Sequence, residues 1–213
     1  MTEKIRVFIV DDHAILRTGL KQILNESDDV CVIGEADCGS KALQSLSQLT
    51  SDVVLLDISL PDRNGLEVLK LIKRDQPKTA VLMLSMHRED QYAIRSLKAG
   101  ASGYLSKQSA DSELLNAVRV VACGKKYVSP EVAQALANQI GEPEDKPRHE
   151  TLSDREFETL RLIASGLTVG DIAEKLCLSV KTVSMYRARL LEKMQLRHNA
   201  ELTHYAIRNN LID

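Results

Sequence analysis

The stretch 53–62, VVLLDISLPD, constrains the fold more than any other part of this sequence. Four apolar residues in a row run into Asp57, and Pro61 follows shortly after. A short apolar run that ends in turn residues is typical of a buried strand in a parallel sheet. Because ligands gather outside the carboxyl ends of such strands, Asp57 is expected where chemistry occurs. The alternative is that Asp57 only caps the following turn.

Strands and helices alternate through the first part of the chain. Besides strand 53–57, apolar β-rich runs predict strands at 5–10, 30–34, 80–84 and 103–105. Helical spacing predicts a first helix with Ile15, Leu16, Leu20, Ile23 and Leu24 on one apolar face, and a second that reaches Leu49. Five strands alternating with five helices predict an α/β fold, a doubly wound, flavodoxin-like, five-stranded parallel sheet.

The composition is that of an ordinary soluble protein, and 213 residues suit two domains. No apolar run approaches the roughly 20 residues that span a bilayer, and no signal peptide is visible. We therefore expect a cytoplasmic protein without a membrane partner. The four cysteines form no CxxC pair and are expected to be reduced thiols. Since the net charge is −2, any affinity for nucleic acid must come from a local patch.

Polar residues follow several of the predicted strands. Asp11 and Asp12 follow the first strand, Asp57 ends the third, Ser85 follows the fourth, and Lys107 follows the fifth. Strand ends meet at one edge of a doubly wound sheet, so these residues should lie together. Crowded carboxylates suit Mg²⁺, and an Asp beside it can accept a phosphoryl group as an acyl phosphate. Each residue alone could be only a surface charge or a turn cap.

These residues, with Pro61 and Gly65 in the intervening loop, make residues 1–124 resemble a two-component response-regulator receiver domain. The resemblance implies that Asp57 is the phosphoacceptor and that a sensor histidine kinase supplies the phosphoryl group. It also implies that Asp12 ligates Mg²⁺ directly and that the carbonyl of Ser59 is a backbone ligand. Tyr104 matches the aromatic switch position of the family and would repack inward on phosphorylation. Gln108 departs from the proline that many receivers have after the lysine.

The chain changes character after residue 125. A linker at 126–150 contains a helix start at Ser129-Pro130 and ends in a polar segment, Gly141–Pro147. Residues 151–213 then form a second, all-α domain. Ser153 and Glu156 have capping-box spacing, and Thr168 caps a second helix. A tight turn leads to a third helix at 180–194, which gives a helix-turn-helix.

The third helix is rich in basic residues, which could also be no more than a solvated face. Motifs such as Ser179-Val180-Lys181-Thr182-Val183 make residues 151–212 resemble a LuxR-type (NarL/FixJ family) DNA-binding domain. Recognition helices read bases near their amino ends and meet phosphates farther along. The expected DNA contacts are therefore Lys181, Thr182, Ser184, Met185, Arg187, Arg189 and Lys193.

Both resemblances together indicate a phosphorylation-controlled transcription regulator that dimerises and binds promoter DNA, with RNA polymerase as a possible further partner. It is not expected to be an enzyme. Aspartyl phosphotransferases and phosphatases typically carry a second Asp two residues after the nucleophile, where this chain has Ser59. A dinucleotide-binding module is disfavoured because no GxGxxG follows the first strand. A regulator that ignores phosphorylation remains an alternative. His87 is a further candidate for tuning the lifetime of the phosphorylated form.

Overall fold

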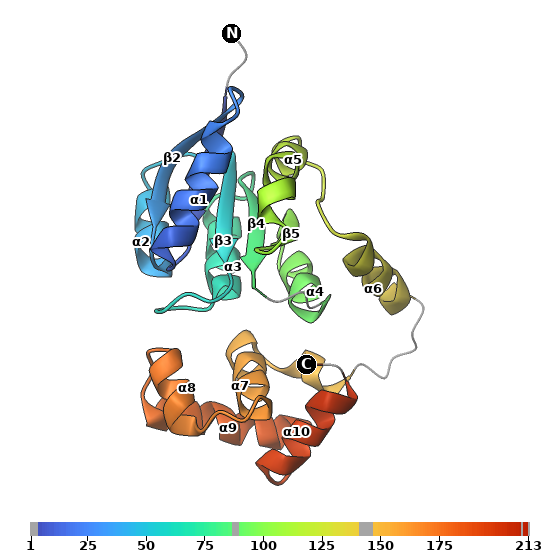
Figure 1. The fold of residues 1–213 in the computed structure, drawn as a ribbon. Coiled ribbons are helices and arrows are strands. Elements are labelled where there is room, and N and C mark those ends of the chain that lie inside the picture. The colour runs from blue at the N-terminus through green and yellow to red at the C-terminus, as the bar shows by residue number, and fades with distance from the viewer. Residues whose placement is uncertain (1–3, 87–89, 141–146, 210, 213) are drawn as a thin grey trace. The chain divides into compact units, whose positions relative to one another are not determined.

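A computed structural model describes residues 4–86, 90–140, 147–209 and 211–212 (Figure 1). The chain divides into two compact units, residues 1–140 and 141–213. His87 lies outside the described residues. Among the helices that the structure describes, none is long and apolar enough to cross a membrane.

The first unit contains the parallel five-stranded sheet that the sequence predicts, in the order β2-β1-β3-β4-β5. Its strands are β1 (Ile5–Val10), β2 (Val30–Ala36), β3 (Val53–Asp57), β4 (Ala80–Ser85) and β5 (Gly103–Ser106). The connecting helices are α1 (Ala14–Asn25), α2 (Gly39–Leu46), α3 (Gly65–Asp75), α4 (Asp90–Lys98) and α5 (Ala110–Ala122).

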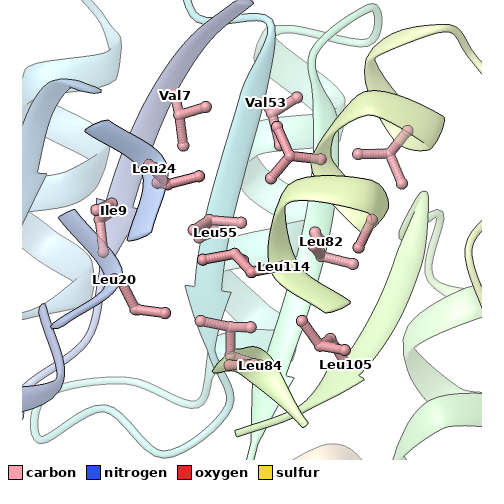
Figure 2. Close-up of a cluster of buried hydrophobic side chains, with 14 of the residues drawn as sticks. Val7, Ile9, Leu20, Leu24, Val53, Leu55, Leu82, Leu84, Leu105 and Leu114 are labelled. Carbon is pink, nitrogen blue, oxygen red and sulfur yellow. The ribbon is translucent and has the colours of Figure 1, made fainter. Parts of the chain in front are cut away.

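The two faces of the sheet are covered by different helices. Successive side chains of a strand point to opposite faces, and Val7, Ile9, Leu55, Leu82 and Leu84 form one apolar cluster with side chains of α1 and α5 (Figure 2). On the other face of β1, β3 and β4, the apolar residues are also buried: Phe8, Val10, Val54, Leu56, Val81 and Met83. Burial on both faces explains why β3 is a continuous apolar run.

Two details of the predicted helices are wrong. Ile15 is 90% exposed, whereas Leu20 and Leu24 of the same helix are buried. The buried stripe of α1 follows Leu20 and Leu24 at helical spacing, and Ile15, five residues before Leu20, lies off that stripe. The second helix, α2, ends at Leu46, so Leu49 is outside it and partly exposed.

The first compact unit continues past residue 125. Tyr127 pairs with Gly103 in a parallel bridge beyond β5, and its carbonyl accepts from the Tyr104 amide at 3.0 Å. A Cβ on Gly103 would lie 2.6 Å from that carbonyl, so only glycine allows this approach. Helix α6 (Pro130–Ile140) follows and packs against α4. The sequence predicted this helix, but not the added strand pairing.

The second unit is helical, with a 3₁₀ turn η1 (Arg148–Thr151) and helices α7 (Asp154–Ala164), α8 (Val169–Lys175), α9 (Val180–Met194) and α10 (Asn199–Arg208). The predicted caps are present. Ser153 and Glu156 form a capping box on α7, and Thr168 forms another on α8 with Asp171. A short turn joins α8 to α9, and Cys177 in this turn has a φ of 50°.

Candidate phosphoacceptor site and nucleic-acid interface

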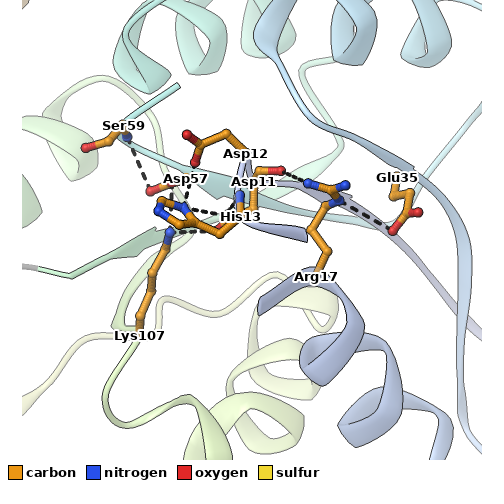
Figure 3. Close-up of polar contacts among 8 residues, drawn as sticks. All are labelled: Asp11, Asp12, His13, Arg17, Glu35, Asp57, Ser59 and Lys107. Carbon is orange, nitrogen blue, oxygen red and sulfur yellow. Dashed lines mark hydrogen bonds and ion pairs between the residues drawn. The ribbon is translucent and has the colours of Figure 1, made fainter. Parts of the chain in front are cut away.

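The acidic residues after β1 and at the end of β3 meet at the carboxyl edge of the sheet (Figure 3). Strands β1 and β3 are neighbours, with Val10 opposite Leu56, so the residues after them come together. Ligand atoms of Asp11, Asp12, His13 and Asp57 lie within 4.8 Å of one another. Asp11 and Asp57 are buried, whereas the Asp12 side chain is 35% exposed. The predicted carboxylate cluster is therefore present.

Lys107 bridges the two buried carboxylates. Its Nζ lies 2.6 Å from Oδ2 of Asp11 and 2.8 Å from Oδ2 of Asp57. Burial alone would lower the pKa of Lys107, but the two carboxylates outweigh burial and the pKa is raised. The backbone amide of Lys107 donates to the carbonyl of Ser85 at 2.8 Å, which ties the loop after β5 to the end of β4.

Asp57 is held in an unfavourable environment for a negative charge. Burial, together with repulsion from Asp11, raises the pKa of Asp57 to about 6, although Lys107 and the Ser59 amide oppose the shift. That amide donates to Oδ1 of Asp57 at 3.2 Å. Three carboxylates face one buried ammonium here, so a hard divalent cation fits the charge and the oxygen-rich donor set.

The loop after Asp57 is closed tightly beneath the site. Ser59 and Asn64 form a bridge, and the Gly65 amide donates to the carbonyl of Ile58 at 2.8 Å. A Cβ on Gly65 would lie 2.1 Å from the carbonyl oxygen of Asp57. Asn64 caps α3 by accepting from the Leu66 amide at 2.9 Å. Glycine at position 65 thus has a steric cause, because the backbone carrying the acidic side chain passes directly against it.

The other two predicted receiver residues are buried near this edge. Ser85 ends β4, one residue after Leu84, which pairs with Asp57. Tyr104 in β5 is only 5% exposed and lines a cavity of about 410 Å³ with Glu113, Tyr127 and Val132. The segment around Tyr127 and α6 covers β5 and contributes to this burial of Tyr104.

Two residues near the site were not singled out from the sequence. Nδ1 of His13 lies 2.7 Å from Oδ1 of Asp12, and the His13 amide donates to Oδ1 of Asp11 at 2.8 Å. Arg17 donates from Nη1 to the carbonyl of Asp11 at 2.6 Å. The position of His13 directly after the acid pair was a usable signal. Arg17 offered none, because it reads as an ordinary surface residue of α1.

Helix α9 presents a polar, partly basic face. Lys181, Ser184, Met185 and Arg189 are exposed and share one side of the helix, while Val183, Leu190 and Met194 are buried. Ser179 caps the helix by accepting from the Thr182 amide at 3.0 Å. Helix α9 packs on α8 across the short turn, which is the arrangement of a helix-turn-helix.

Three of the expected DNA-contacting residues make side-chain contacts within the protein. Oγ1 of Thr182 lies 2.7 Å from Oγ of Ser179. Nε of Arg187 donates to Oδ1 of Asn199 at 2.7 Å, and Nζ of Lys193 lies 2.7 Å from Oε2 of Glu156. Each would have to share or leave its partner in order to reach DNA. These contacts make Lys181, Ser184, Met185 and Arg189 the more available members of the set.

Comparisons with known proteins agree with both halves of this architecture. Residues 7–119 match the response regulator receiver domain family, and residues 150–206 match the bacterial regulatory proteins of the luxR family. A receiver joined to such a domain defines a DNA-binding response regulator, a transcription regulator rather than an enzyme. The chain belongs to the two-component response regulators of the NarL/FixJ family.

Its relatives include full-length members of this family. Response regulator GacA of Pseudomonas aeruginosa is 38% identical over 211 residues, covering 98% of this chain and 98% of GacA. Response regulator UvrY of Escherichia coli K12 is 39% identical over 208 residues, covering 97% and 95% of the two chains. RcsB of Salmonella enterica serovar Typhimurium, solved bound to promoter rprA with the phosphomimetic BeF₃⁻, matches with a TM-score of 0.65 and 27% identity over 95% of this chain and 98% of that one.

Proposed function

We propose that this protein is a transcription regulator switched by phosphorylation of Asp57, with a sensor histidine kinase as the phosphoryl donor. One observation carries the proposal. The buried carboxylate of Asp57, with a raised pKa, shares the Lys107 ammonium with Asp11 and lies beside the Asp11–Asp12 pair at the carboxyl edge of the sheet. A carboxylate used only as a turn cap would not require a buried counter-ion.

Asp11, Asp12, Asp57 and the carbonyl of Ser59 would hold Mg²⁺. The described donors are hard oxygens, and Asp12 is open to solvent and therefore accessible to an incoming ion. Bound there, Mg²⁺ would neutralise charge on the phosphoryl oxygens and on the carboxylates. This accounts for a site that keeps three acidic groups together at a cost in repulsion.

The remaining residues have complementary roles toward the phosphoryl group. Lys107 bridges two carboxylates in this structure, and its ammonium can turn to pair with the added phosphoryl charge. The hydroxyl of Ser85 would donate to a phosphoryl oxygen. The Ser59 amide already donates to Asp57 and helps to hold the carboxylate oriented.

A movement of Ser85 and Lys107 toward the phosphoryl group would be transmitted to Tyr104 along β5. Lys107 and Ser85 are joined through their backbones, and Tyr104 is joined in turn to Tyr127 at the start of the linker. Because Tyr104 is covered by this segment, we infer that its inward repacking on phosphorylation would change how the linker is held. The altered surface would favour a homodimer.

The dimer would bind promoter DNA through α9. Lys181, Ser184 and Met185 lie toward its amino end, where a recognition helix meets base edges, while Arg189 lies farther along, toward the phosphates. Thr182 near the amino end would bond a phosphate, and Arg187 and Lys193 would join after leaving their internal partners. Such a regulator acts in the cytoplasm, and contact with RNA polymerase is a further possibility that follows from promoter binding.

The test combines labelling with footprinting. Wild-type protein treated with acetyl phosphate and Mg²⁺ should be labelled on Asp57 and should protect two half-sites about one helical turn, roughly 10 bp, apart. Asp57→Asn should show neither effect while keeping its fold. Equal protection of one half-site by Asp57→Asn and by phosphorylated wild type would support a regulator that ignores phosphorylation. Acid-stable labelling of Asp57→Asn would remove Asp57 from its role.

A further inference from the structure

Arg17 reaches from α1 back to the acidic loop. Its Nη1 donates to the main-chain carbonyl of Asp11 at 2.6 Å, and its side chain is only 16% exposed (Figure 3). Arg17 is not among the motif residues that indicated a receiver domain. A largely buried guanidinium that donates to the backbone of the acidic loop requires an explanation.

The guanidinium is anchored from the other side by Glu35 in β2. Nε of Arg17 lies 3.6 Å from Oε2 of Glu35, and Nζ of Lys21 lies 2.9 Å from the same oxygen. Glu35 lies opposite Ile9 in the sheet, and the Asp11 amide donates to the carbonyl of Ala36 at 3.1 Å. Arg17 therefore has a long ion pair to β2 on one side, while its hydrogen bond to Asp11 holds the start of the loop.

The bond to the Asp11 carbonyl controls Asp12 through the peptide plane. The carbonyl oxygen of Asp11 and the amide and Cα of Asp12 lie in one plane, so fixing the oxygen fixes the direction in which Asp12 leaves the chain. Asp12 itself is partly exposed, and its carboxylate contacts the exposed His13. The direction of the Asp12 carboxylate thus depends mainly on the backbone at Asp12.

We propose that Arg17 is a positioning residue, which holds the peptide between Asp11 and Asp12 so that the Asp12 carboxylate points to the cation. This inference rests on the proposed function. Charge alone would have the opposite effect, because a cationic side chain next to the site repels Mg²⁺. Whether the Mg²⁺ affinity falls or rises when Arg17 is replaced therefore distinguishes a positioning role from a purely electrostatic effect.

The experiment measures Mg²⁺ binding to the full chain by calorimetry. Arg17→Met should weaken binding by about tenfold, the scale seen when residues that orient metal ligands are removed. Lys21→Met is the matched control, because it removes a cation from the same Glu35 but leaves the bond to Asp11 intact. It should leave the affinity unchanged or slightly tighter. Arg17→Lys, which keeps a donor, should fall between wild type and Arg17→Met.

A second readout needs no metal. In metal-free protein, the amide resonance of Asp12 should shift in Arg17→Met and stay in place in Lys21→Met, because only the former frees the Asp11 carbonyl. If Arg17→Met does not fold, Glu35→Gln, which loosens the anchor of the guanidinium, should weaken Mg²⁺ binding several-fold.

The outcomes separate this inference from the proposed function. Wild-type protein that binds no Mg²⁺ would overturn the proposed metal site and the role of Arg17 with it. Wild-type binding with equal or tighter binding by Arg17→Met would overturn only the role of Arg17. Equal weakening by Arg17→Met and Lys21→Met would also overturn it, since the ion pairs to Glu35 would then be responsible. If Arg17→Met does not fold and Glu35→Gln is tested in its place, an unchanged Mg²⁺ affinity of Glu35→Gln would also overturn the role of Arg17.

Discussion

Replacing the phosphoacceptor should make the metal-free protein more stable. The pKa of Asp57 is raised from its ordinary 3.8 to about 6, so its ionised form opposes folding at neutral pH. A shift of that size corresponds to about 3 kcal/mol at 1.36 kcal/mol per unit. Asn cannot ionise, but its amide is a poorer partner for Lys107. We therefore expect Asp57→Asn to raise the free energy of unfolding by about 1–3 kcal/mol at pH 7.5.

The pH dependence follows from the same shift. Asp57 has a higher pKa in the folded chain than in the unfolded one, so its destabilising effect is complete above about pH 6 and disappears below pH 3.8. The difference between Asp57→Asn and wild type should shrink over the same window as the pH falls. Added Mg²⁺ should reverse the order at neutral pH, since it binds the folded wild type better.

Urea unfolding in the presence of a chelator measures this difference. The helical second unit provides an internal control, because the urea concentration at which it unfolds should be the same in the variant and in wild type. Asp12→Asn, which alters a partly exposed carboxylate, should raise the free energy of unfolding by less than Asp57→Asn does. A metal-free Asp57→Asn protein that unfolds at lower urea than wild type at pH 7.5 would refute the reasoning, because burial and repulsion would then not dominate at this site.

Three further predictions concern the loop beneath the site, the recognition helix and an ion pair of the second unit. Gly65→Ala should lower thermal stability by about 2 kcal/mol or more and slow phosphorylation, since its Cβ would collide with the Asp57 carbonyl; unchanged melting and labelling would contradict this. Met185→Ala should change which sequences are selected from random DNA, whereas Arg189→Ala should weaken all of them and lower the salt slope by about one. The reverse pattern would exchange their roles. Burial would raise the pKa of Glu156, but Lys193 and Ser153 outweigh it and lower the pKa below its usual 4.5. Its stabilisation should be present above pH 4.5 and lost as the pH falls through the lowered value; Glu156→Gln should abolish that dependence and cost about 0.5–1 kcal/mol at pH 7, measured by urea titration.

Much of the fold and site could be predicted because the signals are local. The run before Asp57 is apolar on every residue because β3 is buried on both faces, and Ser153 and Glu156 carry the spacing of a capping box. Strand ends converge by topology, which brought Asp11 and Lys107 to Asp57 without knowledge of any contact.

The missed features depend on contacts between distant residues or on the angle of a single side chain. Arg17 has the sequence appearance of a surface residue, and only the path of the loop gives it a backbone partner. Ile15 counted as apolar at roughly helical spacing, but a difference of one position moved it off the buried stripe. Arg187 and Lys193 are expected from the sequence to contact DNA, although each has a partner in another helix.

The pairing of Tyr127 beside β5 affects where the receiver can be cut. An unpaired edge strand is a template for association with another chain, and here the residues after α5 cover that edge through Tyr127 and its backbone bonds to Ser102 and Tyr104. The Tyr127 hydroxyl also donates to Glu113 at 2.8 Å and fastens the cover to α5. A fragment ending at residue 124 would bare the edge of β5 and invite self-association, so its oligomeric state would reflect the cut rather than the receiver. A fragment ending at residue 140 keeps the edge closed.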